Sequence, residues 1–150
     1  LLKNVPNAEY WWVGNGPLEE RVKTYIEEKK LTKYIKLLGS RNDTVELYQG
    51  MDAFFLPSFF EGLPVTGVEA QAMGLSMVVS DTVTREMVYT DLVDYVSLND
   101  TPEAWASRLE IALRKNAKRE QYADRLKLSN FSNIGCGNRL EQVYCWWING

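Results

Sequence analysis

Two glutamates, Glu61 and Glu69, are the residues of this sequence whose type and surroundings point most clearly to chemistry. They are the only charged residues between Ala53 and Ser80, and no lysine or arginine lies between them. A carboxylate in so apolar a stretch must find hydrogen-bond donors or stay in water. Ionised carboxylates only accept hydrogen bonds, so this pair suits a ligand rich in hydroxyl donors, such as a ribose diol and a hexose.

The residues between the two glutamates add a place for a phosphate. Gly62 and Gly67 allow the backbone to come close to a ligand. The amides from Leu63 to Thr66 form the start of a predicted helix, where the positive end of the helix dipole favours an anion. Each glutamate alone also has an ordinary explanation, because the dipole stabilises an acid in a first turn such as Glu69 by about 0.3–1 kcal/mol. Glu61 alone would suit an exposed turn.

Apolar runs predicted as strands alternate with amphipathic runs predicted as helices. The predicted strands are Tyr10–Val13, Ile35–Leu38, Phe54–Leu56, Met77–Val79 and Val93–Leu98. The predicted helices cover residues 18–26, a short stretch from Asp43, Pro64–Met73 with Gly74 as its stop, and a stretch from Thr101. This alternation predicts an α/β fold with an open, doubly wound, Rossmann-like parallel sheet. Its ligand should bind beyond the carboxyl ends of the strands, near residues 14–17, 40–43, 58–64 and 80–84.

The composition excludes several classes of function. A net charge of -3, from 17 basic and 20 acidic residues, argues against nucleic acid or an anionic lipid surface as the main partner. The sequence contains no histidine, which excludes histidine general bases and histidine-ligated metals within this chain. Cys136 and Cys145 lack the spacing of a zinc site or a disulfide framework, so we expect them reduced, in a cytoplasmic protein. No signal peptide or membrane-length apolar run is visible.

A family resemblance begins with Pro57–Pro64, followed by Glu69–Ala72 and Gly74. These residues resemble the Glu–seven residues–Glu signature of retaining GT-B glycosyltransferases of the group 1 or family 4 type, and are similar to bacterial enzymes of capsular and exopolysaccharide synthesis. The resemblance extends to Val13–Pro17, Leu38–Arg41 and Ser80-Asp81. It implies that residues 1–115 form the C-terminal, donor-binding half of a GT-B fold with its first strand missing. Residues 116–150 would be a helical extension of the same domain.

The resemblance also implies a role for each matching residue of the signature. Glu61 would accept hydrogen bonds from the hydroxyls of the transferred sugar and act in catalysis, and Glu69 would hold the ribose diol. The backbone along the sugar would be that of Gly62, Leu63 and Pro64. The amides at the diphosphate would be those of Val65 and Thr66.

Four residues of the earlier segments complete the expected donor site. The backbone of Ser40 and Arg41 would read the base, with Arg41 beside it, and the loop that contains Gly14 and Gly16 would border the cleft. The family transfers its sugar with retention, through an oxocarbenium-like state in which the leaving diphosphate helps to deprotonate the acceptor. We therefore expect no cofactor, no metal and no side-chain general base, in agreement with the absence of histidine.

One departure from the family pattern concerns the diphosphate. The family places an arginine and a lysine there, from the first strand of this half and the loop after it, and this sequence begins beyond that point. The half that would bind a glycan or lipid-linked acceptor is also absent. Because stabilisation of leaving-group charge is a large part of such catalysis, we expect residues 1–150 alone to be inactive. The whole enzyme would prefer UDP-linked donors and associate at most peripherally with a membrane.

Three alternatives remain beside this hypothesis. A nucleotide-sugar epimerase would share the architecture, although it needs other acid and base residues. A non-catalytic binding or assembly partner would keep the pocket without the cations. A dinucleotide oxidoreductase is disfavoured because Gly14-Asn15-Gly16 lacks the following glycine and the expected acid.

Asp81, which follows a predicted strand, either touches the ligand or caps a turn.

Aromatic and apolar side chains outside the signature have structural interpretations. We expect core and cleft-wall positions for a set of aromatic residues, namely Trp11, Trp12, Phe54, Phe55, Phe59 and Phe60. One face of a last helix would carry Leu140, Val143, Tyr144 and Trp147. That helix either packs on its own domain or leans towards the missing half.

Overall fold

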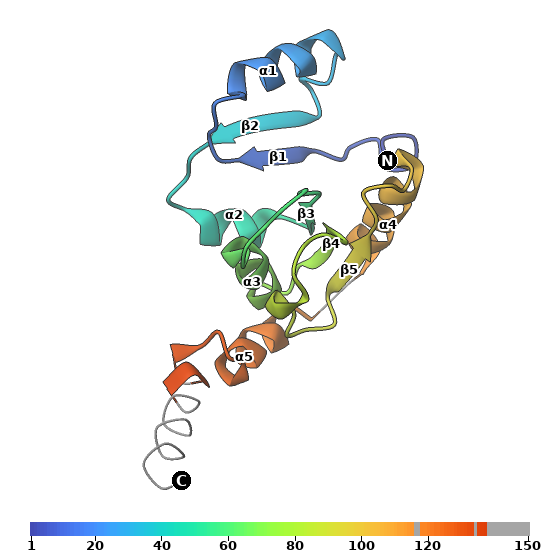
Figure 1. Ribbon diagram of the computed structural model, residues 1–150. Helices are drawn as coiled ribbons and strands as arrows, with labels where there is room; N and C mark the ends of the chain where they lie inside the picture. The colour runs from blue at the N-terminus through green and yellow to red at the C-terminus, as the bar shows by residue number, and fades with distance from the viewer. Residues whose placement is uncertain (116–117, 134, 138–150) are drawn as a thin grey trace, which may run out of the picture. The chain divides into compact units, whose positions relative to one another are not determined.

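The computed structural model describes residues 1–115, 118–133 and 135–137 (Figure 1). Contacts between residues divide the chain into two units, Leu1–Leu47 and Tyr48–Gly150. Each unit has its own parallel strands, and each is described here by itself. The assignment of residues 1–115 to one domain stays a prediction.

The first unit is a strand–helix–strand motif. Strand β1 (Tyr10–Val13) is followed by helix α1 (Glu19–Glu28) and then by strand β2 (Ile35–Gly39). The two strands pair in parallel, with Tyr10 opposite Ile35. Helix α1 forms the crossover that a parallel pair requires, and Ile26 is its buried residue.

The second unit contains a parallel sheet of three strands in the order β3-β4-β5. Its strands are β3 (Ala53–Leu56), β4 (Ser76–Ser80) and β5 (Val93–Val96). Its helices are α2 (Thr44–Gly50), which begins in the first unit, α3 (Val65–Ala72), the short 3₁₀ helix η1 (Arg85–Met87), α4 (Pro102–Arg114) and α5 (Glu120–Leu128). All five residues of the central strand β4 are buried.

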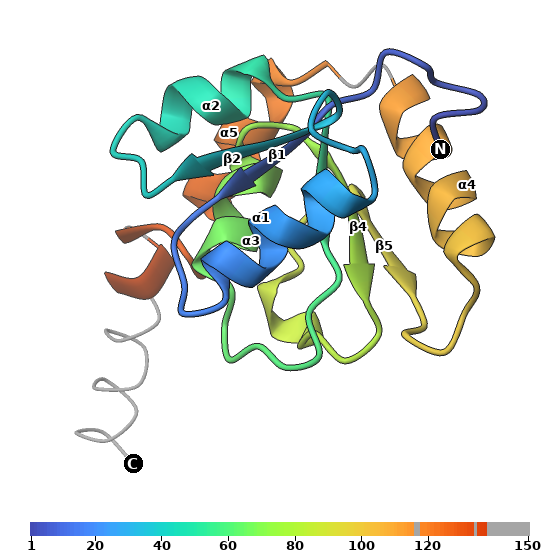
Figure 2. The same ribbon diagram turned by 90° about the horizontal axis from the view of Figure 1, so that it is seen from above.

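Two hydrophobic clusters cover the two faces of this sheet, because successive side chains of a strand point to opposite faces. Met77 and Val79 of β4 pack with Val68 of α3, whereas Val78 packs with Ala112 of α4. Helices α3 and α4 therefore lie on opposite sides of the sheet (Figure 2). This arrangement is the doubly wound α/β fold that the sequence predicts.

The ends of the helices follow the residues that the sequence provides. Helix α3 begins after Pro64 and is followed by Gly74, which has a φ of +69°. A Cβ at that position would also lie 2.7 Å from the Cα of Arg119, so only glycine fits there. Helix α4 begins with Pro102 as its first residue, and the side chain of Thr101 accepts a hydrogen bond from the Ala104 amide (3.3 Å).

The predicted elements are confirmed with small shifts at their ends. Strand β5 ends at Val96, two residues earlier than predicted, and the helix predicted after residue 115 is present as α5, which ends before Ser129.

Among the aromatic residues expected in the core or cleft wall, Phe54 and Phe55 pack against the two hydrophobic clusters. A core position is wrong for Trp12, Phe59 and Phe60, whose side chains are 44%, 84% and 85% exposed.

Part of the C-terminal prediction lies outside the described residues. It comprises the last helical face, which is made of Leu140, Val143, Tyr144 and Trp147, together with Cys145.

Candidate functional site

The loop that carries Glu61 is fastened to the carboxyl end of the central strand. It leaves β3 at Pro57, and the hydroxyl of Ser58 donates a hydrogen bond to Oε1 of Glu61 (2.7 Å). The Ser58 carbonyl accepts two further hydrogen bonds, from Oγ of the fully buried Ser80 and from Oγ1 of Thr82 (2.8 Å). The position of the Glu61 carboxylate therefore depends on hydroxyls at the end of β4.

Glu69 lies on the exposed side of α3, and one of its oxygens is held by a buried tyrosine. The hydroxyl of Tyr48, a residue of α2 that is 6% exposed, donates a hydrogen bond to Oε2 of Glu69 (2.9 Å). Burial raises the pKa of Tyr48 far above its ordinary value, and the hydrogen bond to the Glu69 carboxylate raises this pKa further. The hydroxyl therefore stays protonated at neutral pH and remains a donor.

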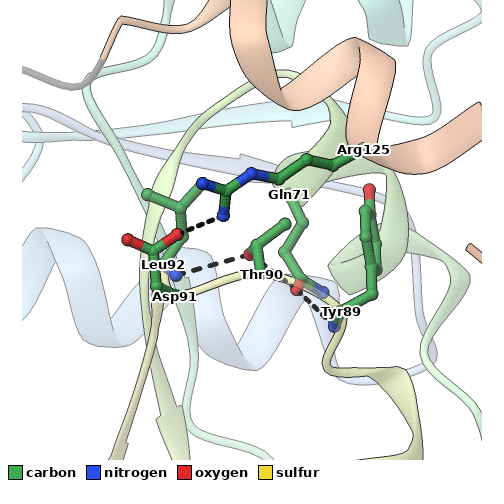
Figure 3. Close-up of polar contacts among 6 residues, drawn as sticks. All are labelled: Gln71, Tyr89, Thr90, Asp91, Leu92 and Arg125. Carbon is green, nitrogen blue, oxygen red and sulfur yellow. Dashed lines mark hydrogen bonds and ion pairs between the residues drawn. The ribbon is translucent and has the colours of Figure 1, made fainter. Parts of the chain in front are cut away.

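The buried side of α3 is fixed by Gln71, which is fully buried (Figure 3). Its Nε2 donates hydrogen bonds to the carbonyls of Gly67 (3.0 Å) and Met87 (2.9 Å). Its Oε1 accepts hydrogen bonds from the Tyr89 amide (3.2 Å) and the Thr90 hydroxyl (2.9 Å). A glutamine amide offers two donor hydrogens and two acceptor lone pairs, so this side chain is fully used.

Further contacts hold α3 against the segment between η1 and β5. The hydroxyl of Tyr89 donates to the Val68 carbonyl (2.9 Å), and burial raises the pKa of Tyr89 to about 12. A Cβ on Gly67 would lie 2.7 Å from Sδ of Met87, so glycine permits this close packing. The helix that carries Glu69 is therefore held from behind by well-packed contacts.

The start of α3 presents backbone amides beside Glu61. The helical hydrogen bonds begin with the amides of Gly67 and Val68, which both donate to the Pro64 carbonyl (2.9 and 3.3 Å). The amides of Val65 and Thr66 precede these bonds, at the positive end of the helix. Both residues are exposed, which suits the predicted contact with a diphosphate.

The remaining signature residues border the same helix start. Gly62 and Leu63 are exposed, whereas Pro64 is buried. A Cβ on Gly62 would meet open space, so the structure gives no packing reason for a glycine at that position.

The predicted residues of the first unit lie at the ends of its two strands. Gly14, with a φ of +124°, donates its amide to the Gly39 carbonyl (2.7 Å), and the Gly16 carbonyl accepts from the Glu19 amide (3.1 Å). Ser40 follows β2 and is exposed. These residues belong to the first unit. Their expected roles, in reading the nucleotide base and in bordering the donor cleft, stay predictions.

Arg41 is engaged in a bidentate ion pair with Asp43. Its Nε lies 2.7 Å from Oδ1 and its Nη2 lies 2.5 Å from Oδ2 of that aspartate. This pairing lowers the pKa of the Asp43 carboxyl and raises the pKa of the Arg41 guanidinium. Because both side chains are exposed, the contact contributes little stability.

Further features of the described residues have structural explanations. Oδ1 of Asp81 accepts a hydrogen bond from the Leu98 amide (3.2 Å), which is the turn-cap interpretation of this residue. A hollow of about 630 Å³ in the first unit is lined mainly by apolar side chains such as Leu18 and Ile26, and it contains none of the predicted donor residues. In the described part of the chain, no three acidic or cysteine side chains are grouped to hold a metal ion. No helix there could cross a membrane.

Sequence reasoning missed Tyr48 and Gln71. Apart from the Gly67 carbonyl, their partners lie 16 to 21 residues away in the chain, outside the element that carries each residue. A weak signal existed for Gln71, since a polar residue stands between the apolar Ala70 and Ala72 on a helix that is otherwise poor in polar side chains.

Comparison with solved structures defines the class of fold. The chain superposes on the pneumococcal O-GlcNAc transferase GtfA, solved in complex with UDP and GlcNAc, with a TM-score of 0.73 and 15% identity over 99% of this chain and 31% of that one. The α/β fold with parallel strands is therefore that of GT-B glycosyltransferases. The family model "Glycosyl transferases group 1" matches residues 1–128, and the chain belongs to this family.

Two curated relatives are similar in sequence. The putative glycosyltransferase EpsF of Bacillus subtilis is 32% identical over 110 residues, which cover 73% of this chain and 29% of that protein. The UDP-Gal:alpha-D-GlcNAc-diphosphoundecaprenol alpha-1,3-galactosyltransferase of Escherichia coli is 38% identical over 78 residues, 51% of this chain and 20% of that protein. The chain thus spans less than a third of the length of either relative. The family match does not favour an epimerase, an oxidoreductase or a non-catalytic partner.

Proposed function

We propose that this chain binds the donor of a retaining glycosyltransferase, which transfers a sugar from a UDP-linked donor to a glycan or lipid-linked acceptor in surface polysaccharide synthesis. The observation that carries this proposal is the pair of carboxylates, Glu61 and Glu69, on either side of the start of α3. A neutral hydroxyl donor orients each carboxylate: Ser58 donates to Glu61, and Tyr48 donates to Glu69. No ion pair of the described residues involves either glutamate, so no cation among them competes with a ligand's hydroxyl donors for the carboxylate oxygens.

The roles of the residues follow from what each group can accept or donate. Glu61 accepts hydrogen bonds from the hydroxyls of the transferred sugar, and Glu69 accepts them from the ribose diol. The amides of Val65 and Thr66 donate to the diphosphate. These amides become more strongly bound as negative charge develops on the leaving group, which lowers the barrier.

The transfer step needs no side chain of this chain as a base. The bond between the anomeric carbon and the phosphate oxygen breaks, and its electron pair leaves with the diphosphate. The acceptor oxygen bonds to the anomeric carbon on the same face, and its proton passes to a phosphate oxygen. We propose that no metal or cofactor takes part, and that the cations expected at the diphosphate come from the remainder of the protein.

The relatives and their chemistry support the choice of substrates. The name of the Escherichia coli relative specifies a UDP-linked galactose and an acceptor on diphosphoundecaprenol, and GtfA was solved with UDP. A lipid-linked acceptor requires the enzyme to work at a membrane surface. We therefore place the whole protein in the cytoplasm, in peripheral contact with the inner face of the membrane.

A transfer assay on the whole protein tests this function. UDP-galactose, UDP-glucose and their N-acetylated forms are offered with a polyprenyl-diphosphate sugar, and the anomeric configuration of the product is read by NMR. We expect an α-linked product from an α-linked donor, and a loss of about 10- to 150-fold in kcat/KM for Glu61→Gln, because hydrogen bonds to a charged group are replaced by neutral ones. Glu46→Gln, at an exposed position of α2, is the matched control. An inverted product, or no transfer from any of these UDP-sugars, would refute the proposal.

A further inference from the structure

The contact between Tyr48 and Glu69 is not explained by packing alone. The Tyr48 ring belongs to the core cluster of the second unit and lies 6.2 Å from the Phe54 ring. A phenylalanine would fill the same space. Burial of a hydroxyl lowers stability unless the hydroxyl forms a hydrogen bond, so its presence points to its partner.

The geometry identifies Glu69 as the acceptor of the Tyr48 proton. The hydroxyl oxygen lies 2.9 Å from Oε2 of Glu69 and 3.4 Å from the Thr66 carbonyl oxygen. A phenol has one hydrogen to donate, and the shorter contact to a charged oxygen is the stronger one. The hydrogen bond therefore joins a fixed, buried group to a carboxylate on an exposed helix face.

A neutral donor has a specific advantage at this position. A free glutamate on a helix surface samples several rotamers, and binding a ligand through it requires one of them to be selected. A lysine or arginine would also select one rotamer, but it would neutralise the carboxylate that must accept hydrogen bonds from the ligand. Tyr48 orients Glu69 and leaves its charge available.

We propose that Tyr48 is a positioning residue for nucleotide recognition: it holds Oε2 of Glu69 so that the carboxylate is preorganised for the ribose 2′,3′-diol of the donor. This inference rests on the proposed function, because it requires that Glu69 binds the ribose. Tyr48 itself does not touch the nucleotide. Its effect should therefore appear only with ligands that carry the two ribose hydroxyls.

The test compares two probes, UDP and 2′,3′-dideoxy-UDP, by calorimetry on the whole protein. Tyr48→Phe keeps the ring and removes the hydroxyl, and we expect it to weaken UDP about 5- to 10-fold with little change for the dideoxy probe. Tyr89→Phe is the matched control, since it removes the hydroxyl of a half-buried tyrosine that also bonds to α3, at the Val68 carbonyl. We expect this control to leave the ratio of the two affinities unchanged. Thermal melting of both variants checks that they fold.

The outcomes distinguish a failure of the positioning role of Tyr48 from a failure of the ribose-binding role of Glu69. If Glu69→Ala abolishes the preference for UDP while Tyr48→Phe retains it, the positioning role is refuted and the ribose role of Glu69 stands. Equal weakening of both probes by Tyr48→Phe, or the same loss of preference in Tyr89→Phe, shows a general structural role and also refutes the inference. If the wild type shows no preference for UDP over the dideoxy probe, or if Glu69→Ala keeps the wild-type preference, the ribose assignment itself fails, and the role of Tyr48 fails with it.

Discussion

Replacement of Gln71 by methionine should loosen the attachment of α3 to the segment before β5. The two side chains have similar size, so the change removes hydrogen bonds while nearly conserving volume. The Gly67 carbonyl keeps a hydrogen-bond partner within the helix. The Met87 carbonyl loses its contact with Gln71, and so does the Tyr89 amide, whose contact is shown in Figure 3. Each buried group left without a partner costs about 1–3 kcal/mol, and the apolar side chain recovers about 1 kcal/mol. Two such groups cost about 2–6 kcal/mol, so we expect a net loss of about 1–5 kcal/mol.

Hydrogen exchange on the whole protein, read by mass spectrometry in peptides that cover residues 85–92, measures this loss locally. A loss of about 1–5 kcal/mol in opening free energy corresponds to exchange about 5- to 4,000-fold faster. The exposed Gln49, changed to methionine in the same way, should alter exchange by less than threefold, or about 0.5 kcal/mol. Less than fivefold acceleration in Gln71→Met would refute the view that this amide fixes α3.

Three further outcomes follow from the described contacts. Gly74→Ala should lower the free energy of unfolding by at least about 2 kcal/mol in thermal melts, because alanine is strained at a positive φ and would clash with the backbone of Arg119. The control Gly16→Ala, in which the added methyl group meets open space, should change this free energy by less than about 0.5 kcal/mol. Ser80→Ala should lower the affinity for the UDP-sugar by about 3- to 10-fold in calorimetry and leave the affinity for free UDP unchanged, since it removes a hydrogen bond that holds the loop carrying Glu61. Equal effects on the two affinities would contradict this. Arg125→Gln should cost less than about 1 kcal/mol at pH 7, because its ion pair with Asp91 (2.6 Å) is exposed, and a larger loss in urea unfolding would contradict this estimate. A backbone hydrogen bond and then Arg125 lower the pKa of the folded Asp91 carboxyl, so the contribution is present above about pH 4 and should vanish as the pH falls through that folded pKa.

The sequence predicts the strands and the start of α3 well because these depend on local patterns. The apolar runs at residues 53–56 and 76–80 are what strands covered on both faces require, and Pro64 and Gly74 mark the ends of a helix wherever it packs. The burial predicted for Phe59 from its hydrophobicity is wrong, because residue type alone does not show whether a loop turns a side chain inward or outward.

The supports of the two glutamates were beyond sequence reasoning. Tyr48 and Gln71 act through partners brought close only by the folded arrangement of α2, α3 and the segment before β5. Periodicity alone would assign both to the hydrophobic core. The glutamates themselves were predictable because they are the only charges of an apolar stretch, and the structure adds the neutral donors that orient them.

Calorimetry with free UDP and a UDP-sugar on Glu61→Ala and Glu69→Ala of the whole protein tests most directly whether the two carboxylates divide the donor between them. Glu69→Ala should weaken free UDP by about tenfold or more, since it removes the charged acceptor of the ribose hydroxyls. Glu61→Ala should leave free UDP unchanged and weaken the UDP-sugar by a similar factor. Unchanged UDP affinity in Glu69→Ala, or the same loss of UDP affinity in both variants, would contradict the assignment of ribose to Glu69 and sugar to Glu61.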